Sequence, residues 1–85
     1  MSDFIARVVA DSTDDPRYPV RATGRVAGPW VEFDASVPGS GFSFWACPAG
    51  DSYDVLDAAD PADGSAPTAA YLDAARAADL RDLGL

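Results

Sequence analysis

The chain has 85 residues and a formal net charge of −8, from 13 Asp and one Glu against six Arg. A chain this short lacks the volume for two separate cores, which predicts one small domain over residues 1–85, and its negative charge disfavours direct binding to nucleic acid or to an anionic membrane. Histidine and lysine are absent and Cys47 is the only cysteine, which excludes catalysis by Ser–His–Asp, Cys–His or Ser–Lys groups, a Cys/His zinc site and an internal disulfide.

Residues 4–10 combine β-branched side chains with the length of a strand, which predicts a first strand there. Residues 11–19 contain two prolines and a cluster of turn-forming polar residues, so we expect an exposed loop. Residues 20–27 and 30–36 alternate apolar and polar side chains, which is typical of half-buried strands.

Gly28 and Pro29 stand between these two alternating segments and suit a two-residue hairpin loop. The register that such a loop imposes pairs Val26 with Val31, Arg25 with Glu32, Gly24 with Phe33 and Thr23 with Asp34. In this register Arg25 and Glu32 face each other on the solvent side, and the ring of Phe33 covers Gly24. Turn chemistry, alternation and cross-strand pairing therefore agree on an antiparallel hairpin.

After a turn at residues 37–41, residues 42–47 predict a further strand that ends at Pro48. Residues 48–66 are expected to form an acidic loop, in which residues 53–56 could add a short strand or a helical turn. Residues 67–83 are rich in Ala, Leu, Asp and Arg and predict a helix. The predicted fold class is α+β, an antiparallel meander of about four strands with one C-terminal helix packed on the sheet.

Aspartates recur at a spacing of three residues in the acidic segment, at Asp51, Asp54, Asp57, Asp60 and Asp63. The pattern departs from the EF-hand loop, which needs alternate oxygen ligands, a central glycine and a terminal glutamate, so we expect no metal site. Two interpretations remain: a solvated loop, or an acidic surface that imitates nucleic-acid phosphates. A single row is too sparse to match the phosphate spacing. Mimicry therefore requires further carboxylates nearby, for which the candidates are Asp14, Asp15, Glu32 and Asp34.

Aromatic side chains offer a second candidate surface. By strand alternation the phenylalanines at positions 33, 42 and 44 face the interior, whereas Trp30 and Trp45 face the other way. If the helix covers only one face, these tryptophans are at least partly exposed and join Tyr53 as anchors for a partner. The alternatives are burial in a homodimer, packing under the acidic segment, and capture of a small molecule between the rings.

These patterns predict a non-enzymatic acidic protein-binding module without cofactor or metal. The expected partner is a protein with a basic surface, by analogy with small acidic phage proteins that inhibit nucleic-acid-handling defence complexes of the CRISPR kind; no motif assigns the chain to a family. The alternative is a structural or accessory subunit whose acidity reflects genome composition or salt adaptation and whose tryptophan face forms an oligomer interface. A third hypothesis is small-molecule sequestration.

Two smaller expectations complete the sequence analysis. No targeting or membrane-spanning segment is recognisable, which predicts a cytoplasmic location, in the host cytoplasm if the protein is viral. Cys47 has apolar neighbours and no adjacent cation, so we expect a small strand residue there rather than a redox-sensitive thiol.

Overall fold

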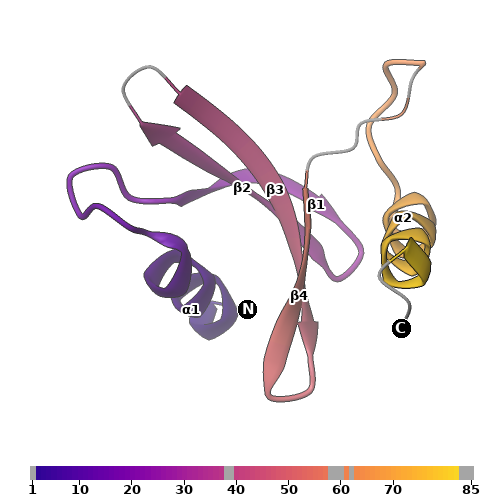
Figure 1. Ribbon diagram of the computed structural model, residues 1–85, viewed down its shortest axis with the longest axis horizontal. Coiled ribbons are helices and arrows are strands. Elements are labelled where there is room, and N and C mark those ends of the chain that lie inside the picture. Colours follow the sequence, from indigo (N-terminus) through magenta and orange to yellow (C-terminus); the bar gives the residue numbers. More distant parts are fainter. Residues whose placement is uncertain (1, 38–39, 58–60, 62, 83–85) are drawn as a thin grey trace.

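The computed structural model describes residues 2–37, 40–57, 61 and 63–82 of the chain. In chain order the elements are α1 (Ser2–Ser12), β1 (Arg21–Ala27), β2 (Trp30–Val37), β3 (Ser40–Ala49), β4 (Ser52–Asp57) and α2 (Ala69–Asp82). The strands form one antiparallel sheet in the order β1-β2-β3-β4 (Figure 1). The predicted α+β class, with an antiparallel four-stranded meander and a C-terminal helix, is confirmed.

The N-terminal segment is a helix, so the prediction of a strand over residues 4–10 is wrong. Its large apolar side chains stand at positions 4, 5, 8 and 9, a spacing that gathers them on one side of a helix but divides them between the two faces of a strand. Packing of this apolar side against the sheet stabilises the helix. Val8 is fully buried, and Phe4, Ile5 and Val9 pack against the same cluster.

The fourth strand of the sheet is β4, which lies within residues 48–66 and replaces the N-terminal strand that was predicted. Half of its residues are apolar or aromatic, at positions 53, 55 and 56, and such side chains suit a pleated surface. Residues 48 and 49 belong to β3. The acidic loop expected over residues 48–66 thus contains a strand, and of the two alternatives left open for residues 53–56 the short strand is confirmed. The strands predicted at residues 20–27, 30–36 and 42–47 correspond to β1, β2 and β3.

The β1–β2 hairpin has the predicted two-residue loop, but its register holds only near that loop. Val26 pairs with Val31 as expected, whereas Phe33 pairs with Ala22 in place of Gly24. Four residue steps of β1 thus cover the length of two steps of β2, which marks a bulge between residues 22 and 26. The predicted pairing of residues 23 and 34 is also wrong, because Asp34 lies opposite residue 21.

The bulge is organised around the carboxylate of Glu32, which is 6% exposed. A buried carboxylate is stable only where its oxygens find donors. Thr23 Oγ1 donates to Oε1 at 2.7 Å and Arg25 Nη1 donates to Oε2 at 3.1 Å. Gly24, between the two donors, has a φ of +95°, which lets both flanking side chains reach Glu32.

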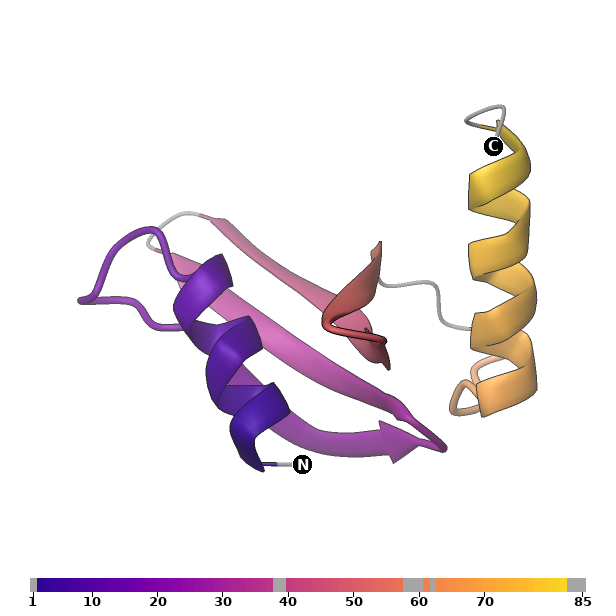
Figure 2. The ribbon, with the colours of Figure 1, turned by 90° about the horizontal axis from the view of Figure 1, so that it is seen from below.

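The two helices cover opposite faces of the sheet, which gives three layers (Figure 2). On the α1 face, Phe33 stacks on Phe44 with ring centroids 5.4 Å apart, and Phe4 of α1 meets Phe33 edge-on at 6.4 Å. On the α2 face, a second cluster contains Trp30, Trp45 and buried side chains of the sheet and α2. Each face of the sheet therefore has its own core.

Helix α2 lies within the predicted range of residues 67–83. Thr68 caps it, because its Oγ1 accepts the backbone N–H of Tyr71 at 3.1 Å. Leu72 is fully buried, and Ala69 and Ala75 pack beside it, so the N-terminal half of the helix makes the sheet contact. In the part of the chain that the structure describes, neither helix has the length and apolar character to cross a bilayer.

Gly28 is required by the close approach of the β1–β2 turn to α2. Its φ of +60° suits the first position of a two-residue hairpin loop, and the fixed φ of Pro29 suits the second. A Cβ on Gly28 would lie 2.8 Å from the Cβ of Ala69. The turn and Ala69, the first residue of α2, are therefore too close for any residue other than glycine at position 28.

Candidate functional site

Aspartates gather along the outer strand of the sheet, and we call Asp51, Asp54 and Asp57 the acidic edge. Asp51 is the second residue of a two-residue turn, in which Gly50 has a φ of +59° and Ala49 pairs with Ser52. Asp54 and Asp57 follow within β4, which is the last strand of the sheet. The structure thus brings three of the five regularly spaced aspartates to the terminal strand of the sheet and the turn before it.

The acidic edge carries charge on both faces of the sheet, because a spacing of three residues meets a strand whose side chains alternate with a period of two. Asp54 projects on the α2 face and forms an ion pair with Arg76, with 2.8 Å between Oδ2 and Nη2. Asp57 pairs with Phe44 in register, on the α1 face, and is exposed. Asp51 and Asp57 have no cationic partner among the described residues.

The end of the β3–β4 hairpin is fastened to α1. Arg7 donates to the main-chain carbonyl of Asp51, and Tyr53 Oη donates to Asp11 Oδ2 at 3.1 Å. Burial, followed by the hydrogen-bonded Asp11 carboxylate, raises the pKa of Tyr53 above its ordinary value. Tyr53 is half-buried against Phe4, at 6.2 Å between ring centroids, so it helps to position the hairpin.

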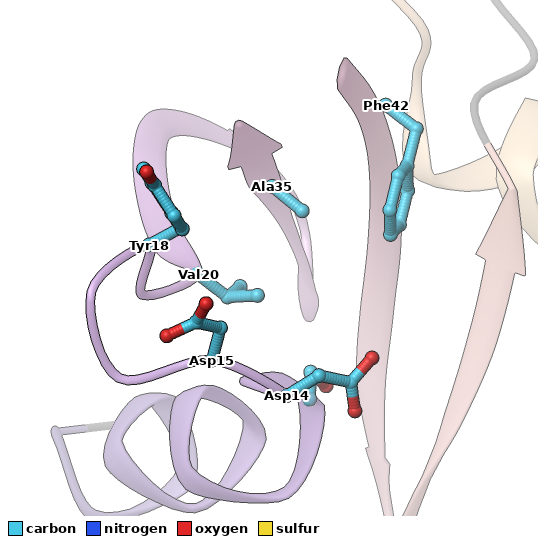
Figure 3. Close-up of a pocket in the computed structure, with 7 residues that line it drawn as sticks. Asp14, Asp15, Tyr18, Val20, Ala35 and Phe42 are labelled. Carbon is cyan, nitrogen blue, oxygen red and sulfur yellow. The ribbon is translucent and has the colours of Figure 1, made fainter. Parts of the chain in front are cut away.

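Asp14 and Asp15 lie in the loop after α1, beside a cavity at the end of β3 that is away from the β3–β4 turn (Figure 3). The cavity has a volume of about 90 Å³ and is lined by Ser12, Asp14, Asp15, Tyr18, Val20, Ala35 and Phe42. Binding pockets for drug-sized molecules measure about 300–1,000 Å³. The cavity is therefore too small for the sequestration of a metabolite of that size.

The two carboxylates of this loop differ in their availability. Asp15 Oδ2 accepts Arg17 Nη2 at 2.9 Å and its Oδ1 accepts Arg17 Nε at 3.2 Å. The side-chain bonds from Arg17, followed by the Arg17 backbone N–H, lower the pKa of Asp15. Asp14 is exposed and has no ion-pair partner in the described part of the chain. Only Asp14 offers a free charge here.

Glu32 and Asp34 do not extend the acidic edge. Glu32 is buried and held by two donors, so its assignment as a partner-binding residue is wrong. Asp34 is exposed but lies on β2, two strands away from β4 and opposite Arg21. Asp14 and Asp15 lie beside Phe42, two residues along β3 from the register partner of Asp57. Of the four carboxylates that phosphate mimicry required, only this pair lies toward the acidic edge, and Asp15 is held by Arg17.

Trp30 and Trp45 are each 1% exposed, so the expectation that they form surface anchors is wrong. They do face away from the phenylalanine cluster, as alternation predicts, but α2 covers them. Trp30 Nε1 donates to Asp73 Oδ1 of α2 at 2.8 Å. The ring centroid of Trp45 lies 5.4 Å from Cζ of the Arg25 guanidinium group. Nε1 of Trp45 is a buried donor with no acceptor among the described residues.

The remaining candidates lie beyond the strand. Asp63 closes a local turn, in which its Oδ1 accepts the hydroxyl of Ser65 at 2.7 Å and the backbone N–H of Ser65 at 2.9 Å. These hydrogen bonds, the side-chain one foremost, lower the pKa of Asp63. Asp60 falls outside the described residues.

Cys47 is half-buried on the α2 face, beside the tryptophan cluster. Burial raises the pKa of its thiol, and the Asp54 and Asp73 carboxylates raise it further against the opposing effect of Arg76. A raised pKa keeps the thiol protonated at neutral pH, and the thiolate is the reactive form. Cys47 therefore occupies an unreactive environment.

Asp73 and Arg76 are structurally important residues that the sequence reasoning missed. Both join α2 to the sheet, at Trp30 and Asp54 respectively, and no local pattern could reveal contacts between residues so far apart in the chain. No group of three or more Cys, Asp or Glu side chains within the described residues could hold a metal ion. Comparison with protein-family models, curated proteins and solved structures finds no match to this chain.

Proposed function

We propose that the chain is a non-enzymatic protein-binding module whose acidic edge docks on a basic, nucleic-acid-binding surface of a partner protein. The observation that carries the proposal is the position of Asp51, in the turn before the terminal strand, and of Asp57, at the end of that strand. Both are exposed and have no cationic partner in the described residues. Free carboxylates at a margin attract a cationic surface and steer its approach. Analogy with acidic phage inhibitors supports a host nucleic-acid-handling complex, such as a CRISPR-like defence complex, as the class of partner.

The spacing of the charges favours docking over imitation of each phosphate in turn. Three residues of a strand span about 10 Å, whereas the two strands of DNA together supply one charge per about 1.7 Å of axis. The acidic edge is therefore too sparse to match phosphates one for one. It can cover the entrance of a basic groove, so the proposed inhibition is by occlusion and electrostatic attraction.

Affinity capture from the source cell or its host, at low and high salt, tests the proposal. Wild type is compared with Asp51→Asn/Asp57→Asn and with the matched control Asp34→Asn/Asp79→Asn, which removes two exposed charges away from β4. We expect a partner that is lost at high salt and lost from the edge variant but retained by the control. Its binding to nucleic acid should fall when the module is added. A partner that is retained equally by both variants would contradict the proposal.

A further inference from the structure

The outer side of β4 is a free strand edge. β4 is the terminal strand of the sheet, and in the described part of the chain no backbone hydrogen bond joins its outer side to another segment. In Figure 1 the two helices lie on either side of β4. The outward N–H and C=O groups of such a strand are a template for one more strand.

β4 is a better template than β1, the other edge of the sheet. It pairs with β3 at six consecutive positions, Ser52–Asp57, without a break in register. β1 is interrupted by the bulge between Ala22 and Val26, and Arg25 within the bulge is turned onto Glu32. A bulge twists an edge and removes regular donors and acceptors, so strand addition is suited to β4 alone.

The side chains of β4 define what kind of strand fits. On the α1 face, Val55 is 51% exposed although it is apolar, and Asp57 stands two residues further along. Cross-strand neighbours are favourable when apolar side chains meet apolar ones and opposite charges meet. The complementary strand therefore places an apolar side chain beside Val55 and Lys or Arg beside Asp57, and a further cation reaches Asp51 at the turn.

A second copy of the chain fits this edge poorly. Two β4 strands side by side would bring together the acidic edges of both molecules, with three aspartates from each. Like charges across neighbouring strands are destabilising. The same carboxylates that disfavour self-pairing favour a cationic strand, so charge selects the occupant of the edge.

We propose that β4 accepts a cationic β-strand of the partner protein, which extends the sheet at the acidic edge. The inference deepens the proposed function and rests on it, because it names the segment by which the basic partner is recognised. Backbone hydrogen bonds supply the attachment, and Asp51, Asp57 and Val55 supply the preference for a strand that presents cationic and apolar side chains two residues apart on one face.

The test uses ¹⁵N-labelled full chain, followed by NMR, and a blocked Lys-Thr-Val-Thr-Val-Thr-Lys peptide, in which Lys and Val stand two residues apart on one face of the strand. A second peptide of equal charge is N-methylated at two adjacent central residues, which removes one backbone donor on each of its edges. We expect shifts concentrated on the amides of Ser52–Asp57, at least tenfold weaker binding of the methylated peptide, and comparable weakening in Val55→Lys. Because Val55 is half exposed, that variant keeps the fold, which circular dichroism verifies.

The outcomes separate the two proposals. If both peptides bind equally but Asp51→Asn/Asp57→Asn weakens their binding relative to Asp34→Asn/Asp79→Asn, the contact is electrostatic only. Strand addition is then overturned and the proposed function stands. If binding ignores the edge variant, both proposals fail. No shift in β4 at millimolar peptide overturns strand addition, as does a dimer in sedimentation that Val55→Lys abolishes, because that result assigns the edge to a second copy.

Discussion

Substitution of Gly28 by alanine tests the packing of the β1–β2 turn on α2. The change has two separable costs. A side chain at the positive φ of +60° costs about 1–2 kcal/mol. The added Cβ would also lie 2.8 Å from the Cβ of Ala69, which is bound directly to the helix backbone and cannot rotate away. Overpacking of this kind costs about 1–3 kcal/mol more.

Gly50 provides the matched control for the first cost. It has nearly the same φ, +59°, and a Cβ there would meet nothing within 4 Å. Gly50→Ala should therefore lower the free energy of unfolding by about 1–2 kcal/mol, and Gly28→Ala by about 2–5 kcal/mol. Each kcal/mol corresponds to about 4–8 °C in Tm for a domain of this size.

Urea unfolding followed by tryptophan fluorescence measures these differences, because Trp30 and Trp45 are both buried in the cluster that α2 covers. Adding Ala69→Gly to Gly28→Ala should recover about 1–3 kcal/mol, the overlap alone, less the helix propensity lost at that position. Equal destabilisation by Gly28→Ala and Gly50→Ala would refute the close approach of the turn to α2.

Three further predictions concern polar groups. Asp73→Ala leaves the buried N–H of Trp30 without its acceptor and should lower the free energy of unfolding, measured in urea, by about 1–3 kcal/mol. The control Asp79→Ala, on the exposed side of α2, should change the free energy of unfolding little. Equal losses in the two variants would contradict the hydrogen bond between Asp73 and Trp30. Because the folded-state pKa of Asp15 is lowered from 3.8, its stabilising effect is fully present above that value and is lost as the pH falls through the folded pKa. Below about pH 4, acid titration followed by circular dichroism should therefore destabilise wild type more than Asp15→Asn, and parallel acid curves would refute this. The raised pKa of Cys47 predicts slower reaction with a disulfide reagent at pH 8 than that of a free cysteine peptide, and a faster reaction would count against its burial beside carboxylates.

Much of the sheet could be predicted from the sequence because its signals are local. Gly28 and Pro29 supply the dihedral angles of a two-residue loop, and alternation along β2 and β3 separates Phe33 and Phe44 from Trp30 and Trp45. A turn and a strand face depend on neighbours within a few residues, so these predictions were confirmed.

The candidate site was only partly predictable. The regular aspartates were visible in the sequence, but the existence of β4 decided that Asp54 and Asp57 stand on opposite faces and that one of them meets Arg76. Glu32 was predicted at the surface, opposite Arg25. That contact is confirmed, whereas the burial of Glu32 depends on the bulge and on the strands beside it.

By itself, the sequence determined the α+β class, the first hairpin turn, the opposite sides of the sheet on which Phe33 and Phe44 and the two tryptophans lie, and the lack of imidazole and amine side chains. Only the tertiary structure decided that residues 2–12 are helical and that Trp30 and Trp45 are buried. The physical reason is that periodicity shows which side chains share a face, whereas burial depends on which distant element covers that face. α1 and α2 cover one face each, and within the described residues no strand pairs with the outer side of β4.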